Sequence, residues 1–154
     1  MLKVFRLIAQ AVAALALAAV LAGAPARGTE GPIPLATVKQ AVNATAANWI
    51  AFRNFNGEQL LYFTQLVSWK CGLREIRYAL NSSHISETWP LPDCDPQNPY
   101  YLDPASAQLY TGFPPGSVKF VSVQVVFSDG TETEVMTYMP CDGAGETSCA
   151  ALMR

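Results

Sequence analysis

The chain has 154 residues, with ten basic and twelve acidic side chains and a formal net charge of −2. Hydrophobic residues make up 51% of the sequence and charged residues only 14%. This sparse and slightly acidic charge excludes function classes that depend on long-range attraction to nucleic acid or to an anionic membrane surface.

The first 26 residues have the three-part pattern of a secretory signal peptide. Lys3 and Arg6 precede an apolar run over residues 7–21, and small residues follow in the segment Ala22–Ala26. We place the cleavage after Ala26. The alternative is a retained anchor, but the run is short for a membrane span of about 20 residues. The pattern therefore predicts a bacterial periplasmic or secreted protein with no stable membrane anchor after cleavage.

The beginning of the mature chain contains one ambiguous segment. Residues 27–36 are rich in Gly and Pro and are expected to form an extended leader. In residues 37–48, Val38 and Val42 recur at helical spacing, which favours a short helix with Thr37 as its N-cap. The alternative is that residues 37–48 form a first β-strand.

The clearest strand pattern is a hairpin centred on Asn56-Gly57, within the stretch 48–81. A two-residue primed turn needs positive φ at both residues, and Asn-Gly tolerates this well. Counting outward from this turn pairs Phe52 with Leu61 on one apolar face. The sequence therefore predicts two antiparallel strands joined at this turn.

A third strand is expected after a bend at Cys71-Gly72. Its alternating side chains place Glu75 and Arg77 toward water as a surface pair, and three residues toward the core: Ile76, Tyr78 and Leu80. A short edge strand within residues 85–91 is expected to follow.

All four cysteines, Cys71, Cys94, Cys141 and Cys149, follow the proposed cleavage site. An even count in an exported chain indicates two disulfides. Of the three possible connectivities we favour 71–94 and 141–149, because each closes a plausible loop. A zinc site is the alternative, but the cysteine spacings match no common zinc-ligand pattern.

Residues 89–117 contain seven of the eleven prolines and are predicted to be a Pro/Tyr-rich loop outside the central sheet. Long irregular segments in compact domains are often functional. Tyr and Trp offer rigid, amphipathic contact area. The aromatic residues of this loop are therefore a candidate face for a protein partner: Trp89, Tyr100, Tyr101, Tyr110 and Phe113. The alternative is that these rings cap the open end of the core.

A second hairpin is predicted in the last third of the chain. A two-residue loop would turn Glu132 and Glu134 toward the core, which costs several kcal/mol for each unpaired carboxylate. A three-residue loop over 128–130 exposes both and pairs Val123 with Val135. The final strand is expected to end at Pro140-Cys141, and the tail, 142–154, to be loosely held apart from its disulfide.

No catalytic residue, cofactor or metal is predicted. His84 near Ser82 could form a base and nucleophile pair, but a solvent-exposed turn is favoured. Glu132 and Glu134 could act in glycoside hydrolysis, but a solvated strand face is favoured. Four residues of one loop could supply oxygen ligands to calcium: Asp93, Asp95, Asn98 and Asp103. Simple Asx turns explain the same residues and are favoured.

Together these patterns predict one disulfide-braced domain over residues 37–141. Its fold class is mostly β: an antiparallel, immunoglobulin-like sandwich of about six strands that can include one short N-terminal helix. The alternative is an α+β fold with that helix packed on an antiparallel sheet. The favoured function is an exported, non-catalytic interaction or structural module. An exported inhibitor or small-ligand-binding protein is the first alternative, and a small hydrolase is the second.

Overall fold

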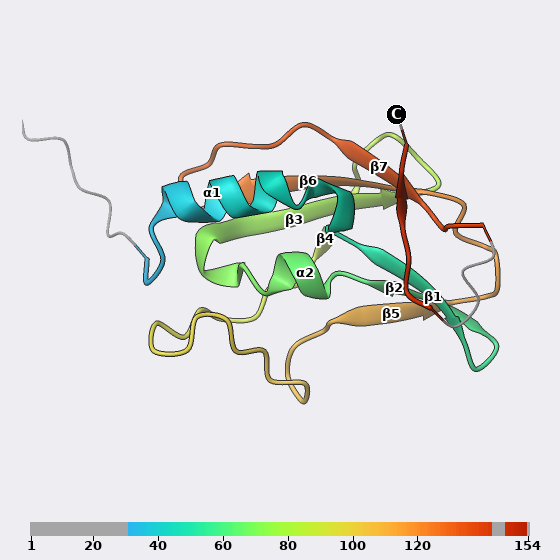
Figure 1. The fold of residues 1–154 in the computed structure, drawn as a ribbon, viewed down its shortest axis with the longest axis horizontal. Helices are drawn as coiled ribbons and strands as arrows, with labels where there is room; N and C mark the ends of the chain where they lie inside the picture. Colours follow the sequence, from blue (N-terminus) through green and yellow to red (C-terminus); the bar gives the residue numbers. More distant parts are fainter. Residues whose placement is uncertain (1–30, 143–146, 154) are drawn as a thin grey trace, which may run out of the picture.

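The computed structural model describes residues 31–142 and 147–153. The predicted signal peptide lies outside the described residues. Two antiparallel sheets dominate the fold, with strand orders β1-β2-β5 and β4-β3-β6-β7-β8 (Figure 1). The helical segments are α1 (Leu35–Ala44), α2 (Thr64–Val67), and the 3-10 helices η1 (Ala46–Asn48) and η2 (Lys70–Gly72). The strands are β1 (Ala51–Phe55), β2 (Glu58–Tyr62), β3 (Leu73–Leu80), β4 (Glu87–Trp89), β5 (Tyr110–Phe113), β6 (Val121–Phe127), β7 (Met136–Met139) and β8 (Ala151–Leu152).

This architecture confirms the predicted fold class, a mostly β, sandwich-like fold with a short N-terminal helix. The described residues form eight strands, compared with the expected six. The two least expected strands are β5, inside the predicted loop 89–117, and β8, inside the predicted tail. Both lie at the edge of a sheet, where a few residues can extend an existing ladder without apolar alternation of their own.

Helix α1 confirms the preference for a helix over a strand in this segment. Val38 and Val42 are fully buried. The helix begins at Leu35, so the predicted cap Thr37 lies inside it, and no side chain caps its first turn. A Cβ at Gly72 would come within 2.6 Å of the Val38 methyl groups, so the close approach of α1 to η2 requires glycine there.

The first hairpin has the predicted register. Asn56 and Gly57 have φ values of 52° and 77°, and Phe52 pairs with Leu61. The prediction of three consecutive strands was incomplete, because α2 and η2 lie between β2 and β3. Leu66 and Val67 in α2 are both buried. Adjacent buried positions do not fit a strand with one solvated face, but they fit a helical turn enclosed by the core.

Strand β3 lies inside its sheet, between β4 and β6. Ile76 is fully buried as expected, whereas Tyr78 and Leu80 are only half-buried. The predicted surface pair is confirmed, because the Arg77 guanidinium lies 2.6 Å from the Glu75 carboxylate. The predicted edge strand is β4.

The second hairpin has the predicted three-residue loop. The Phe127 amide donates to the Thr131 carbonyl at 2.9 Å, and Gly130 has a φ of 84°. Beyond it the predicted pairing was wrong, since Val123 pairs with Met136 and not with Val135. One extra residue between the two ends of the ladder moves every later side chain to the opposite face. This shift exposes Val135 and buries Tyr138.

The buried Tyr138 gives a direct test of this shifted register. Its hydroxyl donates to the Ala46 carbonyl, and burial raises the pKa of its phenol. Tyr138→Phe keeps the ring but leaves a partly buried carbonyl without this donor, so the free energy of unfolding should fall by about 1–3 kcal/mol. Urea denaturation measures it, with Tyr110→Phe on an exposed tyrosine as the control. Equal stability of the two variants would contradict the hydrogen bond that this register gives Tyr138.

The C-terminal segment is part of the fold, so the prediction of a loosely held tail was wrong. β8 pairs with β7. Just before it, Cys149 exchanges both backbone hydrogen bonds with Phe52 of β1, at 2.9 and 2.8 Å. Residues 149–152 therefore connect the edge of the three-stranded sheet to the edge of the five-stranded sheet.

An ion pair between Lys39 of α1 and Asp129 of the β6–β7 loop, at 2.6 Å, makes stability depend on pH. Hydrogen bonds from Lys39 and then Thr131 lower the pKa of Asp129 from 3.8 to about 2. A carboxyl with a lower pKa in the folded state stabilises fully above its unfolded pKa, and this contribution disappears as pH falls through the folded pKa. The melting temperature of Asp129→Asn should therefore fall less than that of wild type when the pH is lowered from 5 to 2. Glu134→Gln is the control, and identical losses for wild type and Asp129→Asn would refute the prediction.

Candidate interaction site

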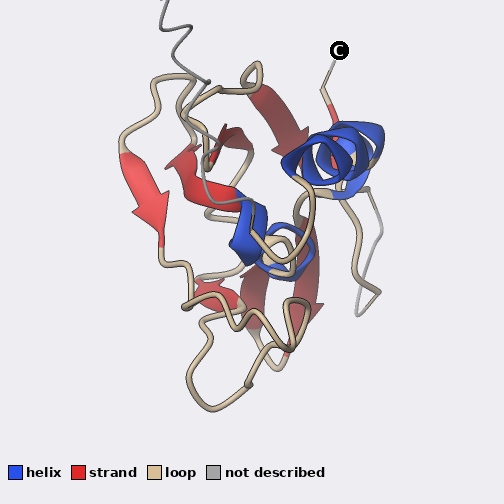
Figure 2. Cartoon of the chain, turned by 90° about the vertical axis from the view of Figure 1, so that its left-hand side faces the viewer, coloured by secondary structure: helices blue, strands red, loops and turns tan. Residues whose placement is uncertain are grey.

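The segment between β4 and β5, residues 90–109, forms no helix or strand and is called the proline loop below. It is the yellow segment beside α2 in Figure 1 and lies at the bottom of Figure 2. Its apolar side chains hold it against the body of the domain. Ala107 is buried, and three partly buried leucines pack against the core: Leu91, Leu102 and Leu109.

A buried lysine fixes the middle of the loop. Lys70 in η2 is only 6% exposed. Its ammonium donates to the carbonyls of Pro99 and Tyr101, at 3.1 and 2.7 Å. The next residue, Cys71, forms the disulfide to Cys94, with a Cα–Cα distance of 4.8 Å. Two neighbouring residues of η2, Lys70 and Cys71, thus hold the loop at three points: Pro99, Tyr101 and Cys94.

Two Asx turns shape the rest of the loop, as predicted. Asp95 accepts from the Gln97 amide at 2.9 Å, and Asp103 accepts from the Ala105 amide at 3.0 Å. The side-chain hydrogen bond from Asn98 is the main cause of a lowered pKa of Asp95. Over residues 31–142 and 147–153, no group of three or more His, Cys, Asp or Glu is placed to hold a metal. The loop geometry therefore favours the turn interpretation over the calcium alternative.

The loop presents two tyrosines to solvent. Tyr100 is 53% exposed and Tyr101 is 63% exposed. The Tyr100 ring meets the Trp69 ring edge-on, with 5.5 Å between centroids. The backbone carbonyl of Tyr101 is one of the two that Lys70 binds. Both rings are therefore displayed from a backbone that is fixed in place.

A cavity of about 410 Å³ opens beside Tyr101. Its charged groups are three carboxylates and the Lys70 ammonium, so its lining is acidic overall. The lining residues are Lys70, Leu91, Pro92, Asp93, Asp95, Tyr101, Asp103 and Ser106.

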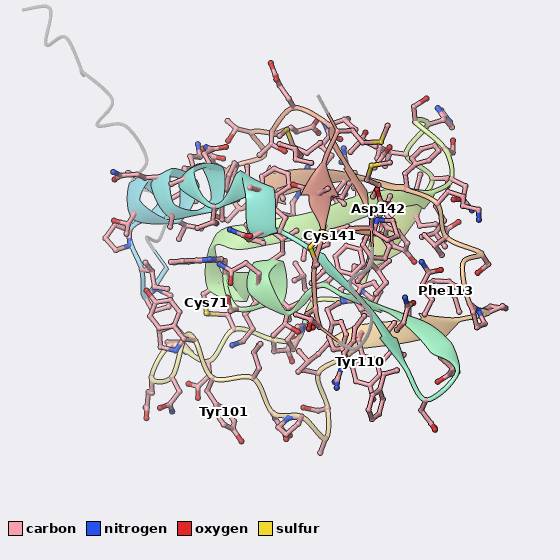
Figure 3. All side chains as sticks on the ribbon, turned by 45° about the vertical axis from the view of Figure 1, so that its right-hand side comes forward. Cys71, Tyr101, Tyr110, Phe113, Cys141 and Asp142 are labelled. Carbon is pink, nitrogen blue, oxygen red and sulfur yellow. A yellow bond between two sulfur atoms is a disulfide. The ribbon has the colours of Figure 1, made fainter. Side chains whose placement is uncertain are left out.

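The five predicted interaction residues do not form one face. Trp89 is 1% exposed and stacks on Phe63 in the core, with 4.2 Å between ring centroids, so its placement on the surface was wrong. Tyr110 lies on β5, where its ring is 5.1 Å from that of Tyr62, and Phe113 is half-buried at the end of the same strand. Figure 3 shows Tyr101 well separated from Tyr110 and Phe113.

Both predicted disulfides are present, Cys71–Cys94 and Cys141–Cys149. This pairing excludes the zinc alternative, since a disulfide sulfur is not a thiolate ligand. Two disulfides are typical of proteins that fold in an oxidising, extracellular type of environment. Among the described helices, none has both the length and the apolar character needed to cross a membrane.

The residues weighed above as catalytic candidates form local hydrogen bonds and ion pairs or are exposed on a connection. The Ser82 hydroxyl accepts from the backbone amide of the exposed His84 at 3.0 Å, as in a local turn. Glu132 is bound by Arg77 at 2.9 Å and by Gln124 at 3.2 Å. Glu134 is exposed on the same connection. Neither group offers the nucleophile and base geometry, or the enclosed carboxylate pair, that hydrolysis needs.

Sequence reasoning missed Lys70, Trp69 and Tyr62. A lysine within an apolar stretch is a weak signal, and its partners are the carbonyls of Pro99 and Tyr101, about thirty residues away. The only usable signal was its position next to a cysteine predicted to be bridged.

No protein-family model, curated protein or solved structure matches this chain.

Proposed function

We propose that this protein is an exported, non-catalytic interaction module that binds a protein partner through Tyr100 and Tyr101. The observation that carries the proposal is that two exposed tyrosines project from a long loop whose backbone is held by a disulfide, a buried lysine and two Asx turns. The proposal of export rests on the signal-peptide pattern of residues 1–26 and on the two disulfides.

A fixed loop is suited to binding because association normally costs conformational entropy. Ordering a mobile side chain or loop at an interface costs about 0.5–1.5 kcal/mol for each immobilised side chain. The Cys71–Cys94 bridge and the Lys70 hydrogen bonds impose this order before a partner arrives. Tyrosine adds a large contact area and a hydroxyl with few rotatable bonds, which makes it frequent among residues that dominate binding energy.

The direct test is site-specific photo-crosslinking in the exporting cell. A benzophenone side chain at position 101 should give one prominent protein adduct, and the same group at the exposed position 134 should not. With the purified partner, Tyr100→Ala and Tyr101→Ala should each raise Kd at least tenfold, whereas Glu134→Gln should leave it unchanged. Absence of an adduct from position 101, or unchanged Kd values for both tyrosine variants, would refute the proposal.

The identity of the crosslinked protein then distinguishes an inhibitor from a structural module. An enzyme whose activity falls at one equivalent of the protein indicates an inhibitor. A component that co-purifies as a stable complex indicates a structural module.

A further inference from the structure

A second cavity, of about 290 Å³, lies at a different place from the proline loop. It is a half-open depression lined by the end of η1 and the start of β1, by the end of β2 and the start of α2, and by the C-terminal segment just before Cys149. The lining residues are Asn48, Trp49, Ile50, Ala51, Tyr62, Thr64, Gln65 and Ser148.

One side of this cavity is apolar and aromatic. Trp49 and Ile50 are buried beneath it. Tyr62 forms a wall, and its ring lies 5.1 Å from the ring of Tyr110, which is itself 53% exposed. The two tyrosines occupy paired positions on neighbouring strands, β2 and β5. Tyr110 is not itself a lining residue, but its ring extends the aromatic surface of Tyr62 away from the cavity.

The polar side chains of the cavity are all neutral. Among the described residues, 31–142 and 147–153, no Asp, Glu, Lys, Arg or His lines it. Besides the Tyr62 hydroxyl, amides and hydroxyls come from four exposed residues whose side chains make no hydrogen bond over the described ranges: Asn48, Thr64, Gln65 and Ser148. Each amide or hydroxyl can both donate and accept.

We propose that this cavity binds a neutral, polyhydroxylated ligand, namely one sugar unit of a saccharide. A sugar hydroxyl also both donates and accepts, so it matches a set of amides and hydroxyls. The C–H face of a sugar ring can pack on the Tyr62 ring. An ionised ligand would lose hydration without finding an opposite charge in this lining. The volume of about 290 Å³ lies just below the range for drug-sized ligand pockets, about 300–1,000 Å³, which suits a single ring.

This inference goes beyond the proposed protein interaction and can fail or succeed independently of it. A glycan array with neutral and anionic oligosaccharides tests it with the full oxidised protein. We expect binding to neutral glycans. Gln65→Ala and Asn48→Ala, both at exposed positions, should weaken it at least fivefold in a titration with the best glycan on the array. Tyr101→Ala, on the proline loop, should bind as wild type does.

Three results would overturn the inference. They are no binding to any glycan, binding only to anionic glycans, or a Kd unchanged in both Gln65→Ala and Asn48→Ala. Tyr62→Ala is expected to abolish binding, and its thermal melting curve shows whether the domain stays folded. Since Gln65 and Asn48 are exposed, their variants keep the test decisive if Tyr62→Ala does not fold.

Discussion

Replacing Cys71 and Cys94 with serine is expected to lower the free energy of unfolding by about 3.5 kcal/mol, the loop-closure value for a bridge of this span. The bridge joins residues 23 positions apart and therefore removes many conformations from the unfolded chain. In the folded state it also holds the proline loop beside Lys70. Urea denaturation of the oxidised protein without reductant measures the loss.

The second disulfide provides the matched control. Cys141 and Cys149 are only eight positions apart, so their replacement with serine should cost less, about 2.5 kcal/mol. The two replacements should also loosen different parts of the structure. Hydrogen exchange should increase in the proline loop for the first variant and at β8 for the second. A smaller loss for the 71–94 variant than for the 141–149 variant would contradict this account.

Trp89→Ala should cost about 3–5 kcal/mol, the range for removing a large aromatic side chain from a core. Trp89 is 1% exposed, stacks on Phe63, and donates its indole N–H to the Gln108 carbonyl at 3.0 Å. The substitution therefore opens a cavity and also releases the end of the proline loop. Thermal or urea denaturation measures the effect.

Tyr101→Ala is the comparison for Trp89→Ala. This tyrosine should change stability by no more than about 0.5 kcal/mol, because it is 63% exposed. A Trp89→Ala variant as stable as Tyr101→Ala would show that Trp89 is not a core residue and would restore it to the interaction face.

Features that depend on neighbouring residues were predictable from the sequence. The Asn56-Gly57 turn, the three-residue loop ending at Gly130 and the spacing of Val38 and Val42 all express local backbone or periodic preferences. The disulfide pairs followed from the even number of cysteines, from the predicted export and from the short loops that they close.

Features that depend on distant residues were not predictable in this way. The shift that pairs Val123 with Met136 buries Tyr138, whose hydroxyl donates to the Ala46 carbonyl, far away in the chain. Strand β8 exists because β7 offers a free edge and Cys149 meets Phe52. The sequence around Tyr138 and Cys149 gives no sign of these distant contacts.

The candidate site shows the same division. Composition located the Pro/Tyr-rich segment and the exposed Tyr100 and Tyr101, but it could not separate these from Trp89, which faces the core. Nor could it find Lys70, whose role comes from two loop carbonyls. The cavity beside Tyr62 combines residues from β1, β2, α2 and the C-terminal segment, so only the fold brings them together.

Backbone ¹⁵N relaxation shows whether the proline loop is fixed in the free, oxidised protein. Tyr100 and Tyr101 should have order parameters of about 0.8 or above, close to the value of about 0.85 for rigid backbone, and equal to those of β3 and β6. Order parameters below about 0.6, the range of flexible segments, at both tyrosines would contradict the claim that this surface is formed before a partner binds.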